Sequence, residues 1–410
     1  MSKFDKGRTS KLIDLCESIT DCHHSTPKWT NEGKIVIRNF NIKNGKLLLD
    51  EISYTDEATY QERISRSQPY PGDLIITREA PMGEVCIIPD GIECCLGQRL
   101  VLIKPNLNKI NNKYLLYALL SEYTQKQIQQ SNNTGSIVSN LRIPLLKNLD
   151  IPLNNNQDKI AAVLSYLDDK IEINNRINSE LENLAKTIYD YWFVQFDFPD
   201  ENGKPYKSSG GKMVYNHELK RAIPAGWEVK KLSNIADITM GQSPDGESYN
   251  EEKKGEIFFQ GSTDFGWRFP TIRQYTTQPS RMAKKGDILL SVRAPVGTLN
   301  IADNDCCIGR GLAALRSKSG FNSYLFYVME YFKTTFDHRN NIGTTFGSIT
   351  KDDLFNLKLV YPDKEHLKKY ELIVSKYNQL ILNNHLQNQQ LTQLRDWLLP
   401  MLMNGQITVK

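Results

Sequence analysis

The chain has 410 residues, 40% of them hydrophobic and 24% charged, with a formal net charge of +4. This length exceeds that of a usual single domain, and no apolar run reaches the roughly 18 residues that a transmembrane helix needs. The charged N-terminus is unlike a signal peptide, so we expect a cytoplasmic protein. The mild positive charge permits nucleic-acid binding without indicating it.

The first half of the chain carries short runs of β-forming residues bounded by Gly, Pro and Asn. These runs predict strands at residues 34–37, 74–77, 85–88 and 100–103, and a tight hairpin turn at 80–83. One helix is expected at 114–129. We therefore predict a first globular domain over residues 1–152, of mixed α and β structure with much strand.

A long helix is predicted after this domain, over residues 153–196. Its apolar positions recur at alternating steps of four and three, as in a coiled coil. This heptad seam consists of Ile160, Leu164, Leu167, Ile171, Asn174, Asn178, Leu181, Ala185, Ile188 and Trp192. Packing on the neighbouring domain alone is an alternative. However, about 35 residues at 1.5 Å each make a rod of roughly 50 Å, longer than a compact domain covers.

The second half of the chain repeats the first. The strings GDLIIT, APMG and CCLG return as GDILLS, APVG and CCIG at residues 286–291, 294–297 and 306–309. A fourth string, GSI, stands at both 135–137 and 347–349. We therefore predict a second globular domain over residues 197–361, with its own helix at 323–336, and a second long helix with a tail over 362–410.

The C-terminal helix carries the same heptad seam, displaced by 210 positions (370 − 160), at Tyr370, Val374, Tyr377, Ile381, Asn384, Asn388, Leu391, Arg395 and Leu398. Equivalent helices of tandem domains should run antiparallel. In a centred register Asn174 faces Asn388 and Asn178 faces Asn384, and such polar pairs disfavour slipped registers. The expected fold class is α+β, with two largely β domains separated by a pair of long antiparallel coiled-coil helices in a pseudo-two-fold arrangement.

The sequence carries no recognisable catalytic apparatus. It lacks a G-x-x-x-x-G-K-[ST] phosphate loop and a G-x-G-x-x-G dinucleotide motif. The Asn-Pro-Pro-aromatic motif of amino-methyltransferases is also missing, and no carboxylate cluster ending in E-x-K, as metal-dependent nucleases use, is visible. The histidines show no ligand spacing, and the adjacent cysteines at 94–95 and 306–307 are unlike a C-x-x-C site. We therefore predict buried strand thiols, no catalytic residue and no metal site.

The whole chain resembles the specificity (S) subunit of type I restriction–modification systems. The duplicated G-D and A-P-x-G strings, each followed by a long helix, carry the resemblance, together with PAGWE at 224–228, MGQSP at 240–244 and the tail at 396–406. The resemblance implies a non-catalytic subunit whose globular domains are target recognition domains. Each would read one half of a split double-stranded DNA sequence, while the paired helices fix the gap and dock two modification subunits.

The resemblance also implies further partners and cofactors. Restriction subunits join such complexes and cleave DNA. S-adenosylmethionine, ATP and Mg are expected on the partner subunits, and none of them on this chain. The exposed apolar positions outside the seam, Ile173, Ile177 and Leu184, are expected to dock the modification subunits.

Base-reading side chains are expected on loops, with Arg reading guanine and Asn or Gln reading adenine. The candidates are Thr26, Lys28, Arg66, Arg78, Arg99, Asn133, Thr134, Gln242, Ser243, Gln260, Arg281, Arg293, Arg310, Asn340 and Thr344. For any one of them an ordinary surface residue is an equally good interpretation. Phe265 and Trp267 are more easily interpreted as core residues than as a flank for a flipped base.

Two other functions stay open at this point. A complete restriction enzyme or methyltransferase is disfavoured because the catalytic motifs are missing. A two-headed adaptor that binds proteins is favoured only by the modest charge.

Overall fold

The computed structural model describes residues 8–130, 140–341 and 348–409, and the side chains of all of these except 334–341. The chain divides into two compact units, and each takes part of both long helices. Unit 1 comprises Met1–Ile173 and Gln387–Lys410, and unit 2 comprises Asn174–Leu386. The boundaries predicted from the sequence instead place each long helix, at 153–196 and 362–410, in a segment separate from the globular domains.

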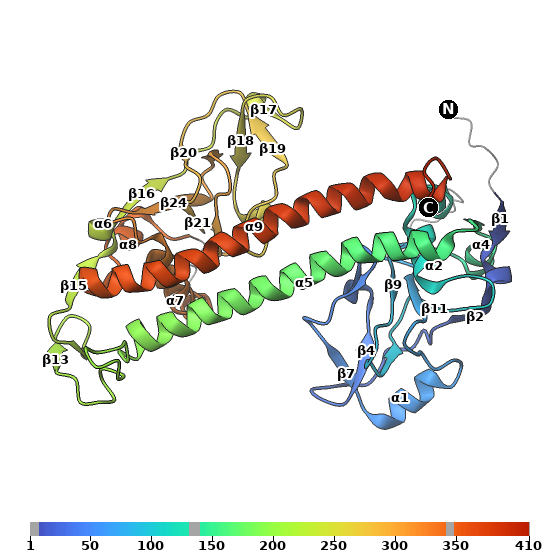
Figure 1. The fold of residues 1–410 in the computed structure, drawn as a ribbon, viewed down its shortest axis with the longest axis horizontal. Coiled ribbons are helices and arrows are strands. Elements are labelled where there is room, and N and C mark those ends of the chain that lie inside the picture. Colours follow the sequence, from blue (N-terminus) through green and yellow to red (C-terminus); the bar gives the residue numbers. More distant parts are fainter. Residues whose placement is uncertain (1–7, 131–139, 342–347, 410) are drawn as a thin grey trace. The chain divides into compact units, whose positions relative to one another are not determined.

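Unit 1 contains two four-stranded sheets (Figure 1). The first is antiparallel, in the order β2 (Cys16–Asp21), β11 (Leu100–Pro105), β8 (Leu74–Thr77) and β9 (Val85–Ile87). The second has the order β10 (Cys94–Leu96), β4 (Lys34–Ile37), β7 (Ser53–Thr55) and β3 (Trp29–Thr30), and its strands β10 and β4 are parallel. Two small ribbons pair β1 (Thr9–Lys11) with β12 (Asp150–Pro152) and β5 (Ile42–Lys43) with β6 (Lys46–Leu47).

The strands predicted in the first half are confirmed, and the turn at 80–83 joins the antiparallel pair β8 and β9. The helices of unit 1's globular part are η1 (Leu12–Leu15), η2 (Asn39–Asn41), α1 (Glu57–Ile64), α2 (Asn112–Leu120), α3 (Glu122–Gln130) and α4 (Ile143–Lys147). The single helix predicted at 114–129 was wrong, because it breaks at Ser121. That residue is extended, and its hydroxyl accepts a hydrogen bond from the Thr124 amide, so it starts a new helix as an N-cap.

Unit 2 repeats the strand order of both sheets of unit 1, with one further strand, β20, at the edge of the mixed sheet. Its antiparallel sheet has the order β16 (Ala236–Met240), β24 (Leu312–Ser317), β21 (Ile288–Ser291) and β22 (Leu299–Ile301). Its mixed sheet has the order β17 (Tyr249–Asn250), β19 (Gln274–Thr276), β18 (Glu256–Phe259), β23 (Cys306–Ile308) and β20 (Met282–Ala283), with β18 and β23 parallel. Ribbons pair β15 (Glu228–Lys231) with β25 (Lys358–Tyr361) and β13 (Met213–Asn216) with β14 (Arg221–Pro224).

The short helices of unit 2 are α6 (Leu232–Ile235), η5 (Gly246–Ser248), η6 (Ser262–Asp264) and α8 (Lys351–Phe355), beside the longer α7 (Asn322–Asn341). The adjacent cysteines of both units lie in β10 and β23. All seven cysteines are buried and free, as the prediction of strand thiols required. Burial raises the pKa of Cys94 and of Cys306 to about 12, which keeps these thiols protonated.

The two long helices are α5 (Gln157–Tyr189), which continues into a π-helical turn at Asp190–Val194, and α9 (Lys364–Met403). Within unit 2 they run antiparallel: Asn384 Nδ2 donates to Asn178 Oδ1 over 2.9 Å, and the Tyr370 hydroxyl donates to the Ala185 carbonyl over 3.2 Å. Within unit 1, Arg395 Nη1 contacts Asp168 Oδ1 at 2.8 Å. The predicted antiparallel helix pair is therefore confirmed.

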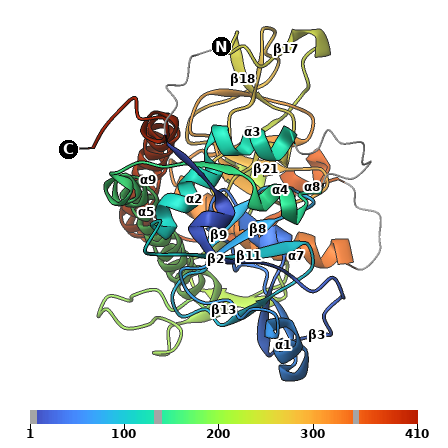
Figure 2. The ribbon, with the colours of Figure 1, turned by 90° about the vertical axis from the view of Figure 1, so that its right-hand side faces the viewer.

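The helices also join the core of each unit. In unit 1, Ile160 and Leu164 of α5 and Leu402 of α9 are buried with residues of α2, which lies beside α5 in Figure 2. In unit 2, the rings of Phe193 and Tyr370 meet at 5.1 Å between centroids. The helices thus pack both on each other and on the sheets. No helix of the described part is both long and apolar enough to cross a membrane.

Candidate nucleic-acid interface

The parallel strand pair of unit 1 brings two loops to one edge of its sheet. Leu96 of β10 lies opposite Ile37 of β4, and the Gly97 amide donates to the Ile37 carbonyl over 2.7 Å. Because parallel strands end at the same edge, Arg38, which follows Ile37, and Gln98, which follows Gly97, both leave the sheet at that edge. A Cβ on Gly97 would lie 2.8 Å from the Ile37 carbonyl oxygen, so only glycine fits this approach.

Unit 2 builds the same edge. Ile308 of β23 lies opposite Phe259 of β18, and the Gly309 amide donates to the Phe259 carbonyl over 2.8 Å. The residues that follow are Gln260 and Arg310. Each unit therefore presents one arginine and one glutamine at the ends of its parallel strands, with the two residue types exchanged between the strands.

A third loop borders this edge in each unit, directly after the first strand of the antiparallel sheet. In unit 1, Gln98 Nε2 donates to the His24 carbonyl and, over 3.3 Å, to Thr26 Oγ1. In unit 2, Ser243 Oγ lies 3.0 Å from Gln260 Nε2 and accepts from Arg310 Nε over 3.3 Å. The three loops thus form one hydrogen-bonded surface of donors and acceptors in each unit. We call it the reading edge.

Comparison with known proteins gives the family. Residues 6–183 and 224–395 match the type I restriction modification DNA specificity domain. The putative type I restriction enzyme MjaX specificity subunit of Methanocaldococcus jannaschii is 33% identical over 411 residues, covering 98% of this chain and 93% of that protein. The chain belongs to the type I restriction–modification specificity subunits.

Two further relatives are more distant. The type I restriction enzyme HindI specificity subunit of Haemophilus influenzae is 22% identical and covers 91% of this chain and 94% of its own length. The crystal structure of a type I restriction-modification system S subunit from M. genitalium is 18% identical. It shares the fold with a TM-score of 0.59, over 98% of this chain and 97% of that one. A specificity subunit is the non-catalytic, DNA-recognising part of such a system, as expected from the sequence.

Three of the cations predicted to bind DNA in unit 1 of this specificity subunit are held by carboxylates. Arg78, whose side chain is 12% exposed, lies 2.8 Å from Asp21 and also donates to the Leu141 carbonyl. Arg99 lies 3.1 Å from Glu79. Lys28 lies 2.8 Å from Asp56 and lowers the pKa of that carboxyl. Their DNA-binding role stays a prediction, but in this structure their charges are already paired.

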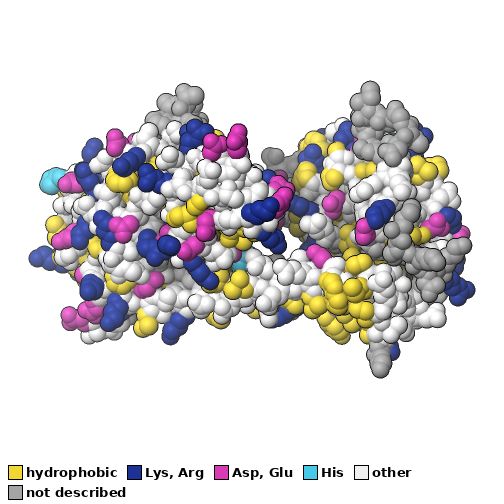
Figure 3. All heavy atoms as spheres, turned by 90° about the horizontal axis from the view of Figure 1, so that it is seen from above, with side chains coloured by type: hydrophobic (Ala, Val, Ile, Leu, Met, Phe, Trp, Pro, Cys, Tyr) yellow, Lys and Arg dark blue, Asp and Glu magenta, His cyan; other side chains and the backbone are white. Residues whose placement is uncertain are grey.

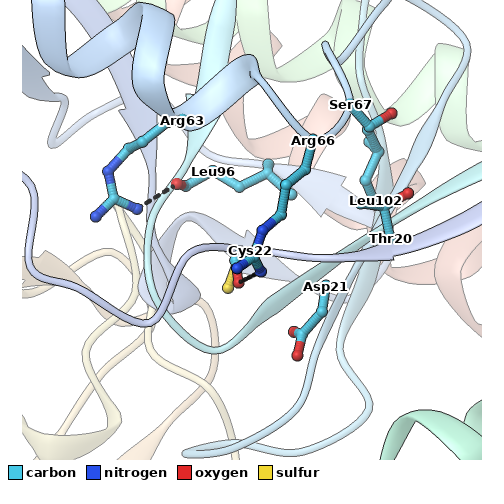
Figure 4. Close-up of a pocket in the computed structure, with 8 residues that line it drawn as sticks. All are labelled: Thr20, Asp21, Cys22, Arg63, Arg66, Ser67, Leu96 and Leu102. Carbon is cyan, nitrogen blue, oxygen red and sulfur yellow. Dashed lines mark hydrogen bonds between the residues drawn. The ribbon is translucent and has the colours of Figure 1, made fainter.

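Arg66 borders a small pocket beside the reading edge (Figure 4). The pocket holds about 10 Å³, lies between Asp21, Cys22 and Arg63, and therefore has room for about one water molecule and no base. Arg66 Nη1 donates to the Cys22 carbonyl over 3.3 Å, and buried Arg63 donates to the Leu96 carbonyl over 3.0 Å. Arg63 thus ties helix α1 to the end of β10, and Arg66, just after that helix, is tied to the loop after β2.

The candidates of unit 2 come together more closely. Gln242, Ser243, Gln260 and Arg310 all lie on the three loops of its reading edge. Arg281 is adjacent, because its carbonyl accepts from the Ile308 amide over 2.9 Å. Arg293 is exposed and makes an isolated β-bridge with Ser348, beside the turn at 294–297. Asn133, Thr134 and Thr344 lie outside the described residues, as does the side chain of Asn340.

Two residues of the reading edge were missed by the sequence analysis, Arg38 and Gln98. Exposed aromatic rings flank Arg38: its guanidinium carbon lies 5.0 Å from the Trp29 ring centroid and 4.7 Å from that of Phe40. The available signal was their equivalence to Gln260 and Arg310, since both pairs follow matching strands. The core interpretation of Trp267 was wrong, because this side chain is 55% exposed, whereas Phe265 packs against a small core.

The helix positions predicted from the heptad seam also have a defined setting. Asn178 and Asn384 are hydrogen-bonded to each other in unit 2, as the centred register requires, and Asn174 is buried on the same seam. Ile173, Ile177 and Leu184, predicted to dock partner subunits, have 43%, 42% and 50% of their surface exposed. The roles of Asn174, Asn388 and the three apolar residues stay predictions.

On the face drawn in Figure 3, the surface charge does not by itself mark a DNA-binding site. Figure 3 shows one face of the molecule, on which Lys and Arg are interspersed with Asp and Glu instead of gathering in one basic patch. This distribution agrees with the small net charge of +4. Site assignment therefore depends on the geometry of individual side chains and not on the overall electrostatic field.

Proposed function

We propose that each unit reads one half of a bipartite double-stranded DNA site. The observation that carries this proposal is the reading edge, which is built twice by the same topology but ends in different side chains. Arginine is the side chain that most often recognises guanine in the major groove, by two parallel hydrogen bonds. Because Arg38 and Gln98 in one unit stand where Gln260 and Arg310 stand in the other, the two half-sites should differ in sequence.

The two long helices would set the unspecified gap between the half-sites. A helix of 33 residues such as α5 is about 50 Å long at 1.5 Å per residue, compared with roughly 34 Å for one turn of B-DNA. Helices of this length can span more than one turn. The buried asparagine pair Asn178–Asn384 supports a fixed register for the helix pair within unit 2.

The chain would work in the cytoplasm within a complex that also contains two modification subunits and restriction subunits. The modification subunits would bind S-adenosylmethionine and methylate adenine, and the restriction subunits would use ATP and Mg to cleave DNA. The chain itself would contribute the recognition of the DNA sequence. Its seven free, buried cysteines fit a reducing compartment.

Docking of the modification subunits would use the exposed apolar side chains of the helices. Replacing Ile177 and Leu184 with Glu should abolish co-purification with a modification subunit, because both side chains are at least 42% exposed and would place charge in the interface. The reading edges should remain folded, which is checked by thermal unfolding of the variant. Unaltered assembly would contradict this docking face.

The decisive experiment is methylome sequencing of a host that expresses this chain with a modification subunit. A split motif of methylated adenines should appear, and it should vanish when the chain is deleted. Replacing residues 227–360 with the corresponding unit of another specificity subunit should change one half of the motif only. A protein-binding adaptor would give no such motif, and that result would overturn the proposal.

A further inference from the structure

We propose that Arg38 and Arg310 are the guanine-reading residues of the two units, one for each half-site. This inference rests on the proposed function, since it assigns the readers within the half-sites. It starts from what direct reading requires: a guanidinium must reach the base edge with two N–H groups that are not already held by a carboxylate.

Arg38 meets this requirement. It is exposed, and within the described part of the chain it has no carboxylate within ion-pair distance; its one hydrogen bond from the guanidinium is a long contact of 3.5 Å to Ser53 Oγ. Trp29 and Phe40, which are 44% and 46% exposed, hold the guanidinium by their ring faces. Such stacking orders the group while leaving its hydrogen-bonding edge open.

Two neighbouring arginines of unit 1, Arg78 and Arg99, do not meet the requirement. Arg78 is held by Asp21, Asn140 and Leu141, and Arg99 by Glu79. Reading a base with either would first break a charge-assisted bond, which lowers the discrimination that the contact can give. They are therefore better placed to orient the loops around Arg38.

Arg310 is the equivalent reader in unit 2. It is exposed and stands between Gly309 and Gly311, and its Nε donates to Ser243 Oγ over 3.3 Å. No carboxylate among the described residues lies within ion-pair distance of its two terminal nitrogens. One bond through Nε leaves both terminal nitrogens for a bidentate contact, which is the geometry that guanine O6 and N7 accept.

The glutamines of the two reading edges act as positioning residues. Gln98 bonds to His24 and Thr26, and Gln260 bonds to Ser243, so each glutamine joins a strand end to the loop after the first strand. In unit 1 the arginine follows the first parallel strand and the glutamine the second, and in unit 2 the order is reversed. The two parallel strands lie about 4.8 Å apart. The two units therefore present their arginines at different places of a common frame.

The experiment compares methylomes of hosts that express the wild-type complex, Arg38→Ala or Arg310→Ala. Each substitution should make one guanine position of one half-site degenerate, with a loss of discrimination of about 10- to 100-fold, and leave the other half-site unchanged. The two substitutions should affect opposite halves. Arg8→Ala, which removes an exposed arginine next to β1, should leave the motif as it is.

The outcomes separate this inference from the proposed function. If the wild-type complex gives no split motif, the proposed function fails. If the wild type gives one and Arg38→Ala keeps every position as selective as before, the assignment of Arg38 is overturned while the proposed function stands. If Arg38→Ala lowers the melting temperature, Arg38→Lys replaces it, because lysine keeps the charge but lacks the bidentate fork. A folded variant that methylates no sequence at all also overturns the assignment.

Discussion

Arg268 offers a sharp test of how, within unit 2, the globular part packs against the two long helices. Its side chain comes from the loop before β19 and is 2% exposed. Nη1 lies 2.7 Å from Glu182 Oε1 on α5, and Nη2 lies 2.7 Å from Asn378 Oδ1 on α9. The guanidinium carbon lies 4.0 Å from the ring centroid of Phe326 on α7. One side chain thus joins a loop to three helices, and Arg268→Ala removes all of these contacts.

The expected cost follows from what each partner loses. Breaking a buried ion pair by removing one member costs about 3–5 kcal/mol, and the lost cation–π contact adds about 1 kcal/mol. The Glu182 side chain is 25% exposed and can recover part of its hydration, and Asn378 keeps a 2.9 Å hydrogen bond to Ser323. We therefore expect the free energy of opening unit 2 to fall by about 2–4 kcal/mol.

Native-state amide hydrogen exchange can measure this cost in each unit separately, because a chain with two units need not unfold in one step. Slow amides of β21 and β24 in unit 2 should exchange roughly 30- to 1000-fold faster in Arg268→Ala, at 1.4 kcal/mol for each factor of ten. Arg273→Ala is the matched control, since it removes an exposed arginine paired with Asp264 on the same unit. A change below threefold, or an equal change in the control, would refute the reasoning.

Three further predictions follow from other contacts. Asn178→Leu should lower the free energy of unfolding by about 1–3 kcal/mol, because Asn384 loses its hydrogen-bond partner. Adding Asn384→Leu should restore stability. If the urea midpoint of the double variant is as low as that of the single variant, this prediction is contradicted. Gly97→Ala should cost about 1–3 kcal/mol and weaken selectivity in one half-site, since its Cβ would press on the Ile37 carbonyl; an unchanged methylome and melting temperature would count against it. Burial raises the pKa of Cys86 from 9.0 to about 12. Between pH 9 and 12 the thiol therefore ionises in the unfolded chain but not in the folded one, and the free energy of unfolding should fall as the pH rises. Urea titrations from about pH 8 to 10.5 should show the unfolding free energies of wild type and Cys86→Ala diverging with pH.

Much of the scaffold could be predicted because its signals are local. The strands of 74–77 and 100–103 show as β-forming runs, and the helix pair shows as a heptad period that either helix carries alone. The asparagine register follows because a duplicated sequence places identical residues at symmetric positions of an antiparallel pair. The break at Ser121 was missed because its hydroxyl caps a new helix inside a run of good helix formers.

The reading edge could be predicted only in part, since it depends on contacts between distant segments. The parallel pairing of β4 with β10 has no local signal, and without it Arg38 does not stand out. Gln98 could have been found from the duplication, because it follows the string CCLG as Arg310 follows CCIG. Arg78 was chosen because it lies two residues before the turn at 80–83, whose sequence pattern returns at 294–297. Asp21, whose carboxylate forms an ion pair with Arg78, is 57 residues away in sequence, so the pairing is visible only in the folded chain.

The duplication also explains how a specificity subunit can change its target without losing its fold. The residues repeated in both units, such as Gly97 and Gly309, are those that the close approach of two strands requires. The residues directly after them, Gln98 and Arg310, project from the strand ends instead of filling a core, and they differ between the units. A substitution there alters hydrogen bonds at the surface but removes little buried apolar area, so its cost in stability should be small. The strand frame and the side chains that project from its edge can therefore change independently, and an exchange of arginine with glutamine between neighbouring strands is one such step.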